Sequence, residues 1–142
     1  MVRKILVAVD GSESGERALG KAIEEAKKWD ADLHAIYVVE SGLFSSLPMD
    51  NTLEVIYSLL EKEGEDLLAE SRAQAESAGV SLNTHIRQGH AGSEIIALAE
   101  ELSADLILLG SHGKSEVDRL LLGSVTDYVV RHSRITTTVV RT

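Results

Sequence analysis

Short apolar runs recur along the chain and predict the strands of a sheet. Residues 5–9 and 106–109 are apolar without internal alternation, which indicates strands that are buried on both faces, and residues 33–39 form another apolar run. Residues 80–87 alternate between apolar and polar positions, as expected of a strand with one less covered face, such as an edge strand. A last run at 135–140 predicts a fifth strand.

Between these runs, apolar residues recur at the spacing of a helix. This spacing predicts helices at residues 14–29, 52–78, 95–102 and 124–132. Strands and helices therefore alternate from the first strand to the last, with connections long enough for right-handed crossovers. The pattern predicts an α/β fold, namely a doubly wound parallel sheet of five strands with helices on both faces. No linker, repeat or low-complexity segment divides the chain.

Composition narrows the class of protein. The 142 residues, of which 44% are hydrophobic, are enough for one domain with a sizeable core, and the absence of cysteine excludes disulfides and thiolate chemistry. A net charge of −9 argues against general nucleic-acid binding, which needs a basic face. No apolar run approaches the ~18 residues of a membrane span, and the amino terminus lacks the length and cleavage site of a signal peptide. We expect a cytoplasmic protein.

Residues 106–130 carry the clearest sign of function. The predicted strand ends at Gly110, a second glycine follows at Gly113, and Gly123 stands beside Ser124 where a helical pattern begins. Glycines accept positive φ and have no Cβ, so the backbone can turn its N–H groups toward a phosphate at close range. The unpaired N–H groups and the positive dipole at the helix start favour the same anion. These four residues therefore predict a phosphate cradle.

Two better known glycine motifs do not fit. Residues 113–115 read Gly-Lys-Ser, the end of a P-loop, but Leu108 stands where the first glycine of that motif belongs. The dinucleotide fingerprint would follow the first strand, where residues 10–15 read Asp-Gly-Ser-Glu-Ser-Gly instead. A loop whose glycines only turn the chain and cap a helix stays open as the structural alternative.

The loop resembles the nucleotide-binding signature of the universal stress protein family, which is Gly, two residues, Gly, nine residues, then Gly-Ser or Gly-Thr. Every fixed position of that signature is matched. The surrounding segments Gly-Ser-His-Gly and Leu-Leu-Leu-Gly-Ser-Val are similar to the sequences usually found there in the family. The resemblance implies one Rossmann-like nucleotide-binding domain over residues 1–142, with strand order 3-2-1-4-5. It also implies that the ligand is ATP or another adenine nucleotide, bound where the strand order reverses.

The resemblance implies particular contacts around the cradle. Asp10, at the end of the first strand, would contact the adenosine part of the nucleotide, although a turn or a helix cap is the structural alternative for this residue. The backbone at Val38 would meet the adenine edge. Ser124 would donate its hydroxyl to a phosphate, Val125 would line the sugar-phosphate pocket, and Ser111 lies between the first two glycines.

Two basic residues and a histidine near the loop are further candidates for contact with a ligand. Lys114 and Arg119 could neutralise phosphates, but acidic residues are equally near in this segment. His112 is a candidate catalytic residue, but the sequence does not indicate a serine or an acidic residue as its partner. Mg²⁺ or Mn²⁺ held through the phosphates and Asp10 is compatible with the usual ligands of such ions, whereas the other histidines lack the spacing of a transition-metal site.

The resemblance also implies an assembly. In the family, the last strand often pairs with its copy in a second subunit, so we expect a homodimer through the strand from Ile135 to Val140. This chain has threonines at 136–138, where the family usually shows Cys-Pro and then apolar residues. Threonine favours strands, but Thr137 and Thr138 bring hydroxyls that need hydrogen-bond partners if they are buried.

Three functions remain open at the level of the sequence. The preferred one is an ATP-binding regulatory or stress-response module whose nucleotide state alters the surface offered to a protein partner. The second is a slow ATPase, or an enzyme that phosphorylates itself on Ser111 or Ser124, but the sequence shows no poised base, arginine finger or second acidic metal ligand. The third is a dimeric interaction scaffold that binds no nucleotide. We therefore assign no catalytic residue.

Overall fold

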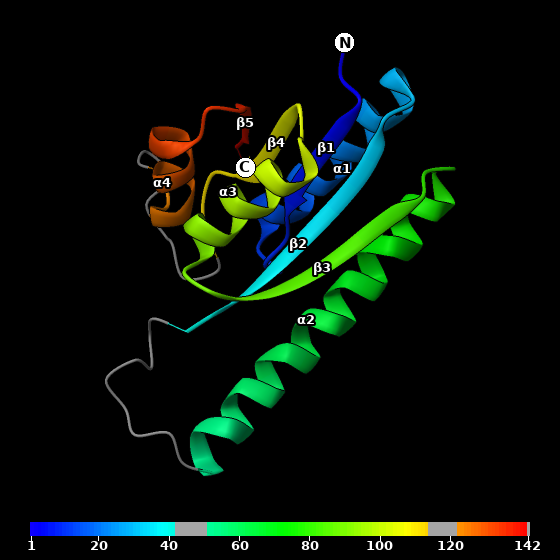
Figure 1. Ribbon diagram of the computed structural model, residues 1–142. Helices are drawn as coiled ribbons and strands as arrows, with labels where there is room; N and C mark the ends of the chain where they lie inside the picture. Colours follow the sequence, from blue (N-terminus) through cyan, green and yellow to red (C-terminus); the bar gives the residue numbers. More distant parts are fainter. Residues whose placement is uncertain (42–50, 114–121, 142) are drawn as a thin grey trace.

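The computed structural model describes residues 1–41, 51–113 and 122–141. Within them, five parallel strands form one sheet in the order β3-β2-β1-β4-β5, which confirms the predicted fold class and strand order (Figure 1). The strands are β1 (Lys4–Ala8), β2 (Asp32–Glu40), β3 (Leu82–Gly89), β4 (Leu106–Gly110) and β5 (Thr136–Val140). The helices are α1 (Glu13–Trp29), α2 (Asn51–Ser77), α3 (Ala91–Leu102) and α4 (Ser124–His132).

Helices cover both faces of the sheet (Figure 1). Ile5 and Val7 of β1 belong to the core that α1 and α2 form on one face, while Leu6 belongs to the core of α3 and α4 on the other. All three side chains are fully buried. Burial on both faces explains why this strand shows no polar alternation. Among the described residues, no helix has the length and apolar character needed to cross a membrane.

The two edges of the sheet are β3 and β5, so the prediction of an edge strand from the alternating pattern is confirmed. The bounds differ from the prediction at both edges. β3 ends at Gly89 rather than at residue 87, because it pairs with β2 as far as Glu40. At its start, Val80 lies in the turn after α2 rather than in the strand, and its N–H donates to the carbonyl of Ala75. β5 begins at Thr136, one residue later than predicted.

The turn between β1 and α1 shows which residue caps the helix. Ser12 is the N-cap, since its hydroxyl accepts a hydrogen bond from the N–H of Gly15 at 3.0 Å. Asp10 therefore does not cap α1. Its Oδ1 atom instead accepts bonds from the N–H of Ser12 at 2.9 Å and from the Ser12 hydroxyl at 2.6 Å. The carboxylate thus forms an Asx turn that holds it at the end of β1.

Candidate functional site

A pocket of about 200 Å³ opens at the carboxyl ends of β1 and β4, where the strand order reverses. This is the point at which open α/β sheets usually bind their ligands. All of the site residues predicted from the sequence line this pocket except Ser111. They are Asp10, Val38, Gly110, Gly113, Gly123, Ser124 and Val125.

Ser111 lies behind the pocket wall. It is fully buried, and its N–H donates to the carbonyl of Val140 at the end of β5. Its hydroxyl lies 2.9 Å from Nδ1 of His112. The serine partner for His112 that the sequence did not supply is therefore the preceding residue, although this serine is not part of the pocket lining.

Close packing explains two of the three loop glycines, Gly110 and Gly123, whereas a Cβ on Gly113 would make only an ordinary contact. None of them has a positive φ, so the conformational reason given from the sequence does not apply to them. A Cβ on Gly110 would lie 2.5 Å from the carbonyl carbon and the hydroxyl of Ser14 in the first turn of α1. A Cβ on Gly123 would lie 3.2 Å from the Cα of His112, and one on Gly113 would lie 3.5 Å from Oδ2 of Asp10. The missing side chains let α1, β4 and α4 converge on the pocket.

The amino terminus of α4 is open toward ligands. Gly123 is the N-cap and offers no side chain to bond the N–H groups of the first turn, and Ser124, the first helical residue, is exposed. Unpaired N–H groups at the positive end of a helix dipole attract an anion. Thr126, which the sequence gave no reason to select, also lines the pocket, and its hydroxyl donates to the carbonyl of Gly110 at 2.6 Å. This bond fixes the helix start to the end of β4.

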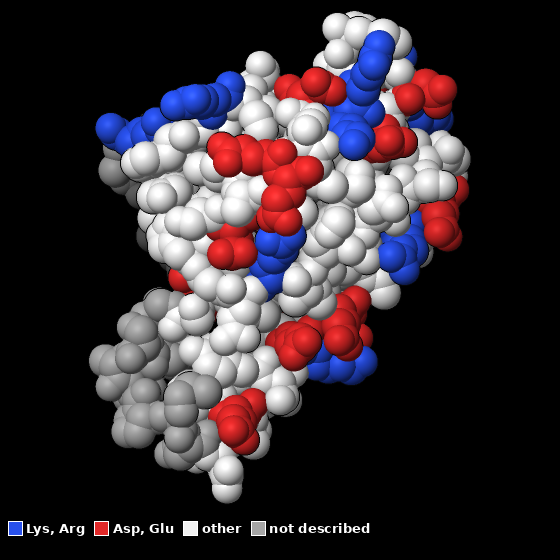
Figure 2. Space-filling view, in the orientation of Figure 1, with Lys and Arg blue, Asp and Glu red and all other residues white. Residues whose placement is uncertain are grey.

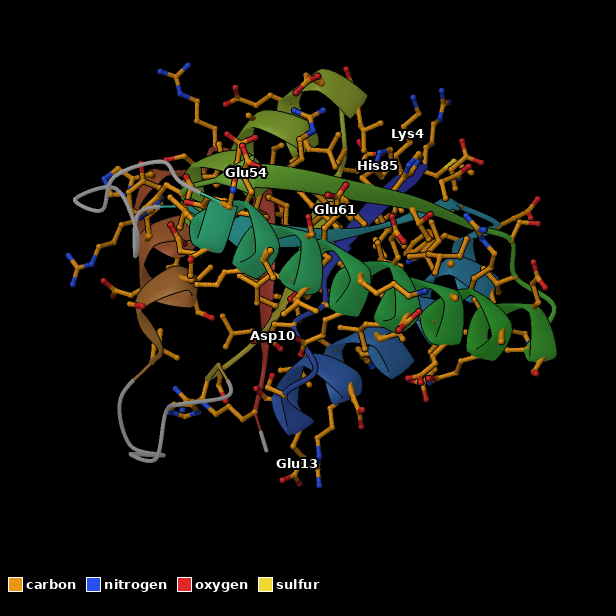
Figure 3. The ribbon with its side chains drawn as sticks, turned by 90° about the horizontal axis from the view of Figure 1, so that it is seen from below. Lys4, Asp10, Glu13, Glu54, Glu61 and His85 are labelled. Atoms are coloured by element: carbon orange, nitrogen blue, oxygen red, sulfur yellow. The ribbon has the colours of Figure 1, made fainter. Side chains whose placement is uncertain are left out.

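Asp10 offers one free oxygen beside the glycine loop. The carboxylate is exposed and lies just before α1 (Figure 3). Oδ1 is occupied by Ser12, whereas Oδ2 accepts no hydrogen bond from any residue that the structure describes. An ionised carboxylate only accepts hydrogen bonds, so this atom suits sugar hydroxyls or a hard cation and would repel an unshielded phosphate.

The inner wall of the pocket is apolar. Ala8 of β1, Ile36 and Val38 of β2, Ile95 of α3 and Leu109 of β4 contribute side chains to it. A flat apolar group can therefore lie against the strands while an anionic group reaches the start of α4. The site is shaped for a molecule that has both parts.

The turn before α3 is held by a backbone hydrogen bond at Ala91. The N–H of Ala91 donates to Oε2 of Glu40 at 2.9 Å. Gly92 follows because a Cβ would lie 2.4 Å from the ring of Tyr128 on α4. These contacts tie the ends of β2, α3 and α4 together near the pocket.

His112 is held in the loop by its backbone. The Ser14 hydroxyl donates to the His112 carbonyl at 2.7 Å, and the His112 N–H donates to the same hydroxyl oxygen at 3.2 Å. His112 lines the pocket and is 9% exposed. Its Nε2 atom is buried and has no hydrogen-bond partner in the described structure. Sequence reasoning missed Ser14, because its partner is 98 residues away.

The remaining predictions concern charged groups. Lys114 and Arg119 lie outside the described residues. In the described ranges, no three His, Asp or Glu side chains come together as metal ligands. Asp10 would therefore be the single carboxylate that this part of the chain offers to an ion bound through phosphates.

Comparisons with known proteins agree with this arrangement. A model of the universal stress protein family matches residues 1–141. The universal stress protein MJ0531 of Methanocaldococcus jannaschii is 38% identical over 141 residues, which is 99% of this chain and 83% of the relative. The solved structure of the hypothetical protein MJ0577 aligns with a TM-score of 0.89 at 27% identity, over 100% of this chain and 97% of that one. A universal stress protein crystallised in complex with cAMP aligns with a TM-score of 0.67 at 27% identity, over 99% and 97%.

The match extends over nearly the whole chain in each of these comparisons. The matched residues contain β1, where the strand order of this chain reverses, and the glycines that line its pocket. The fold, the spacing of the glycines and the identity to a named relative lead to the same conclusion: this chain belongs to the universal stress protein family.

Proposed function

We propose that the protein binds an adenine nucleotide, ATP in the first instance, and acts as a nucleotide-dependent regulatory module in a cytoplasmic stress response. The observation that carries this proposal is the convergence of three features on one pocket. The open amino terminus of α4 suits phosphates, the free oxygen of Asp10 suits sugar hydroxyls, and the apolar wall suits a base. The solved relative in complex with cAMP supports an adenine nucleotide as the class of ligand.

Each lining residue has a role in this proposal. The phosphates lie against the N–H groups that follow Gly123, with the Ser124 hydroxyl as an additional donor. Oδ2 of Asp10 accepts from the ribose. The adenine lies on the apolar wall with its edge toward the backbone of Val38, and Val125 packs beside the sugar. Gly110 and Gly113 keep the loop close enough for these contacts.

Mg²⁺ or Mn²⁺ would accompany the polyphosphate. Such ions commonly bind through one or two carboxylates, the phosphates and several waters. The free Oδ2 of Asp10 fits the part of a single protein ligand, and the ion would supply the positive charge that lets this carboxylate lie near a phosphate. Ribose binding and ion binding are alternative uses of the same oxygen.

We further propose that the protein is a binding module rather than an enzyme. The Ser111 hydroxyl beside His112 would be the obvious nucleophile, but it is fully buried and does not line the pocket. A bound nucleotide would therefore not meet an activated serine at that position. A slow ATPase remains the alternative, and steady release of phosphate that Gly113→Val abolishes would favour it.

A homodimer through β5 completes the proposal. This strand is an edge strand, and the Thr137 hydroxyl donates to the carbonyl of Ile135 at 3.0 Å, so this threonine needs no partner from a second subunit. Its other threonines, Thr136 and Thr138, favour the extended backbone that strand pairing requires. A nucleotide at the end of the adjacent strand β4 could alter the surface that the dimer presents to a protein partner.

Mass spectrometry of small molecules released from the denatured protein, followed by ATP titration, tests the proposal. We expect released or titratable ATP in the wild type and a loss of affinity of at least about tenfold in Gly123→Val, because the added side chain meets the backbone of residues 111–113. Gly20→Val is the control, since a Cβ at Gly20 meets no atom within 4 Å. Absence of nucleotide binding in the wild type would leave the interaction scaffold in its place.

A further inference from the structure

The imidazole of His112 contains a buried ring nitrogen that bonds to nothing in the described structure. Nε2 is out of reach of solvent and unpaired, although the residue His112 lines the pocket. Buried polar atoms almost always have a partner, because leaving one without a hydrogen bond costs free energy. Such an atom at a binding pocket indicates that the partner arrives with the ligand.

The neighbouring serine determines whether this nitrogen is a donor or an acceptor. The Ser111 hydroxyl lies 2.9 Å from Nδ1, is fully buried, and makes no other hydrogen bond in the described residues. If the hydroxyl donates to Nδ1, its proton is satisfied and the neutral ring carries its own proton on Nε2. The opposite assignment leaves both the serine proton and Nε2 unpaired. The contacts therefore favour Nε2–H, a donor that needs an acceptor.

The position of His112 indicates which acceptor this is. Its Cα lies 3.2 Å from the point that a Cβ of Gly123 would occupy, and Gly123 is the N-cap of α4. The histidine is thus part of the junction where the helix dipole already favours an anion. Ser14 holds the histidine backbone on both its N–H and its carbonyl side, so the loop presents this ring from a fixed position.

We propose that Nε2–H of His112 donates a hydrogen bond to a phosphate oxygen of the bound nucleotide, and that Ser111 is a positioning residue that keeps the proton on Nε2. The inference rests on the proposed nucleotide pocket and adds a phosphate contact from a side chain to those from the backbone. Because Nε2 is buried in the structure, the His112 side chain must move on its fixed backbone to meet the phosphate.

Two substitutions of His112 separate its ring nitrogens. Asparagine places its amide near the position of Nδ1 and can still form a hydrogen bond with the Ser111 hydroxyl. It has no atom at the position of Nε2. Gln extends an amide N–H to about the position of Nε2 and restores the donor. We expect His112→Asn to lose roughly tenfold to hundredfold in ATP affinity, as for a hydrogen bond to a charged group, and His112→Gln to keep most of it. Both variants should bind adenosine, which has no phosphate, as the wild type does.

Nitrogen NMR of the histidine ring provides the second readout. In the wild type without nucleotide, His112 should show the Nε2–H tautomer, and addition of ATP should shift this proton downfield and slow its exchange with water. Ser111→Ala should give a mixture of tautomers and weaker ATP binding without changing adenosine binding. Equal ATP affinity in His112→Asn and wild type, or an unchanged ring spectrum in a wild type that binds ATP, would overturn the inference while leaving nucleotide binding intact. A wild type that binds no ATP would overturn both.

Discussion

At the scale of single residues, the loop glycines are selected by what lies next to them. Gly110 touches the first turn of α1, and Gly123 touches the backbone at His112. The sequence predicts correctly that the backbone comes close to other groups here. The sequence also leads us to expect glycine here because of a positive φ, but Gly110, Gly113 and Gly123 do not have one. The partners across these contacts are distant in sequence, so the packing reason could not be predicted from the loop alone.

A substitution of Gly110 tests this packing explanation. Gly110→Ala should lower the free energy of unfolding by about 1–3 kcal/mol, because the added Cβ would meet backbone atoms of Ser14 and Gly15 that have no room to move. Gly20→Ala should instead be neutral or raise it by about 0.5–1 kcal/mol, since Gly20 lies inside α1 with open space around it. Urea unfolding measures both changes. Equal stability of the two variants would show that β4 does not need this close contact.

At the scale of elements, the hydrophobic pattern predicts the kinds and order of strands and helices well. The uninterrupted apolar runs at β1 and β4 show that these strands are buried on both faces of the sheet. The order of the strands follows from the family resemblance. The pairing of His34 with His85 could not be predicted, because it depends on the register in which Ile36 faces His85 across β2 and β3. The burial of Ser111 could not be predicted either, because it depends on β5. The N–H of Ser111 donates to the carbonyl of Val140 in that strand.

The two histidines make the β2–β3 pairing sensitive to pH. Nδ1 of His34 lies 2.9 Å from Nε2 of His85, and burial lowers the pKa of both rings. The positive charge of Lys4 lowers the pKa of His34 further while Asp32 opposes it. For His85, the charges of His34 and Arg87 act downward and that of Glu101 upward.

The unfolded chain therefore binds these protons more readily than the folded one, and stability falls as pH drops below the ordinary histidine pKa of about 6.5. We expect urea unfolding to show this loss between pH 7 and pH 5, above the range in which carboxylates titrate. His34→Gln combined with His85→Gln should flatten the dependence, because both titrating rings are then removed. An equally steep loss in the double variant would assign the pH dependence to other groups.

At the scale of the whole molecule, acidic and basic side chains alternate on the face shown in Figure 2, where Lys and Arg lie in separate groups. The net charge of −9 gives two copies of the chain a general repulsion, so a dimer needs specific contacts to form. Strand pairing supplies such contacts through the backbone. An edge strand leaves a row of N–H and C=O groups unpaired, and β5 is one of the two edges of the sheet.

The register of β5 identifies which backbone groups a second copy would use. The carbonyl of Val140 accepts from the N–H of Ser111, so Val140 and Thr138 direct their backbone groups toward β4. The alternate residues, Thr137 and Val139, direct theirs outward. Proline at an outward position removes a donor from the free edge and keeps the inner ladder, as in natural edge strands.

Val139→Pro should therefore convert a dimer into a monomer while leaving the sheet and the nucleotide pocket in place. Sedimentation velocity of wild type and variant measures the assembly, and ATP titration of the variant checks that the pocket survives. Thr138→Pro is the contrasting variant, because it removes a donor to β4 and should lower the unfolding free energy as well. A Val139→Pro protein that remains dimeric and folded would place the interface elsewhere on the molecule, and a wild type that sediments as a monomer would remove the dimer from the proposed function.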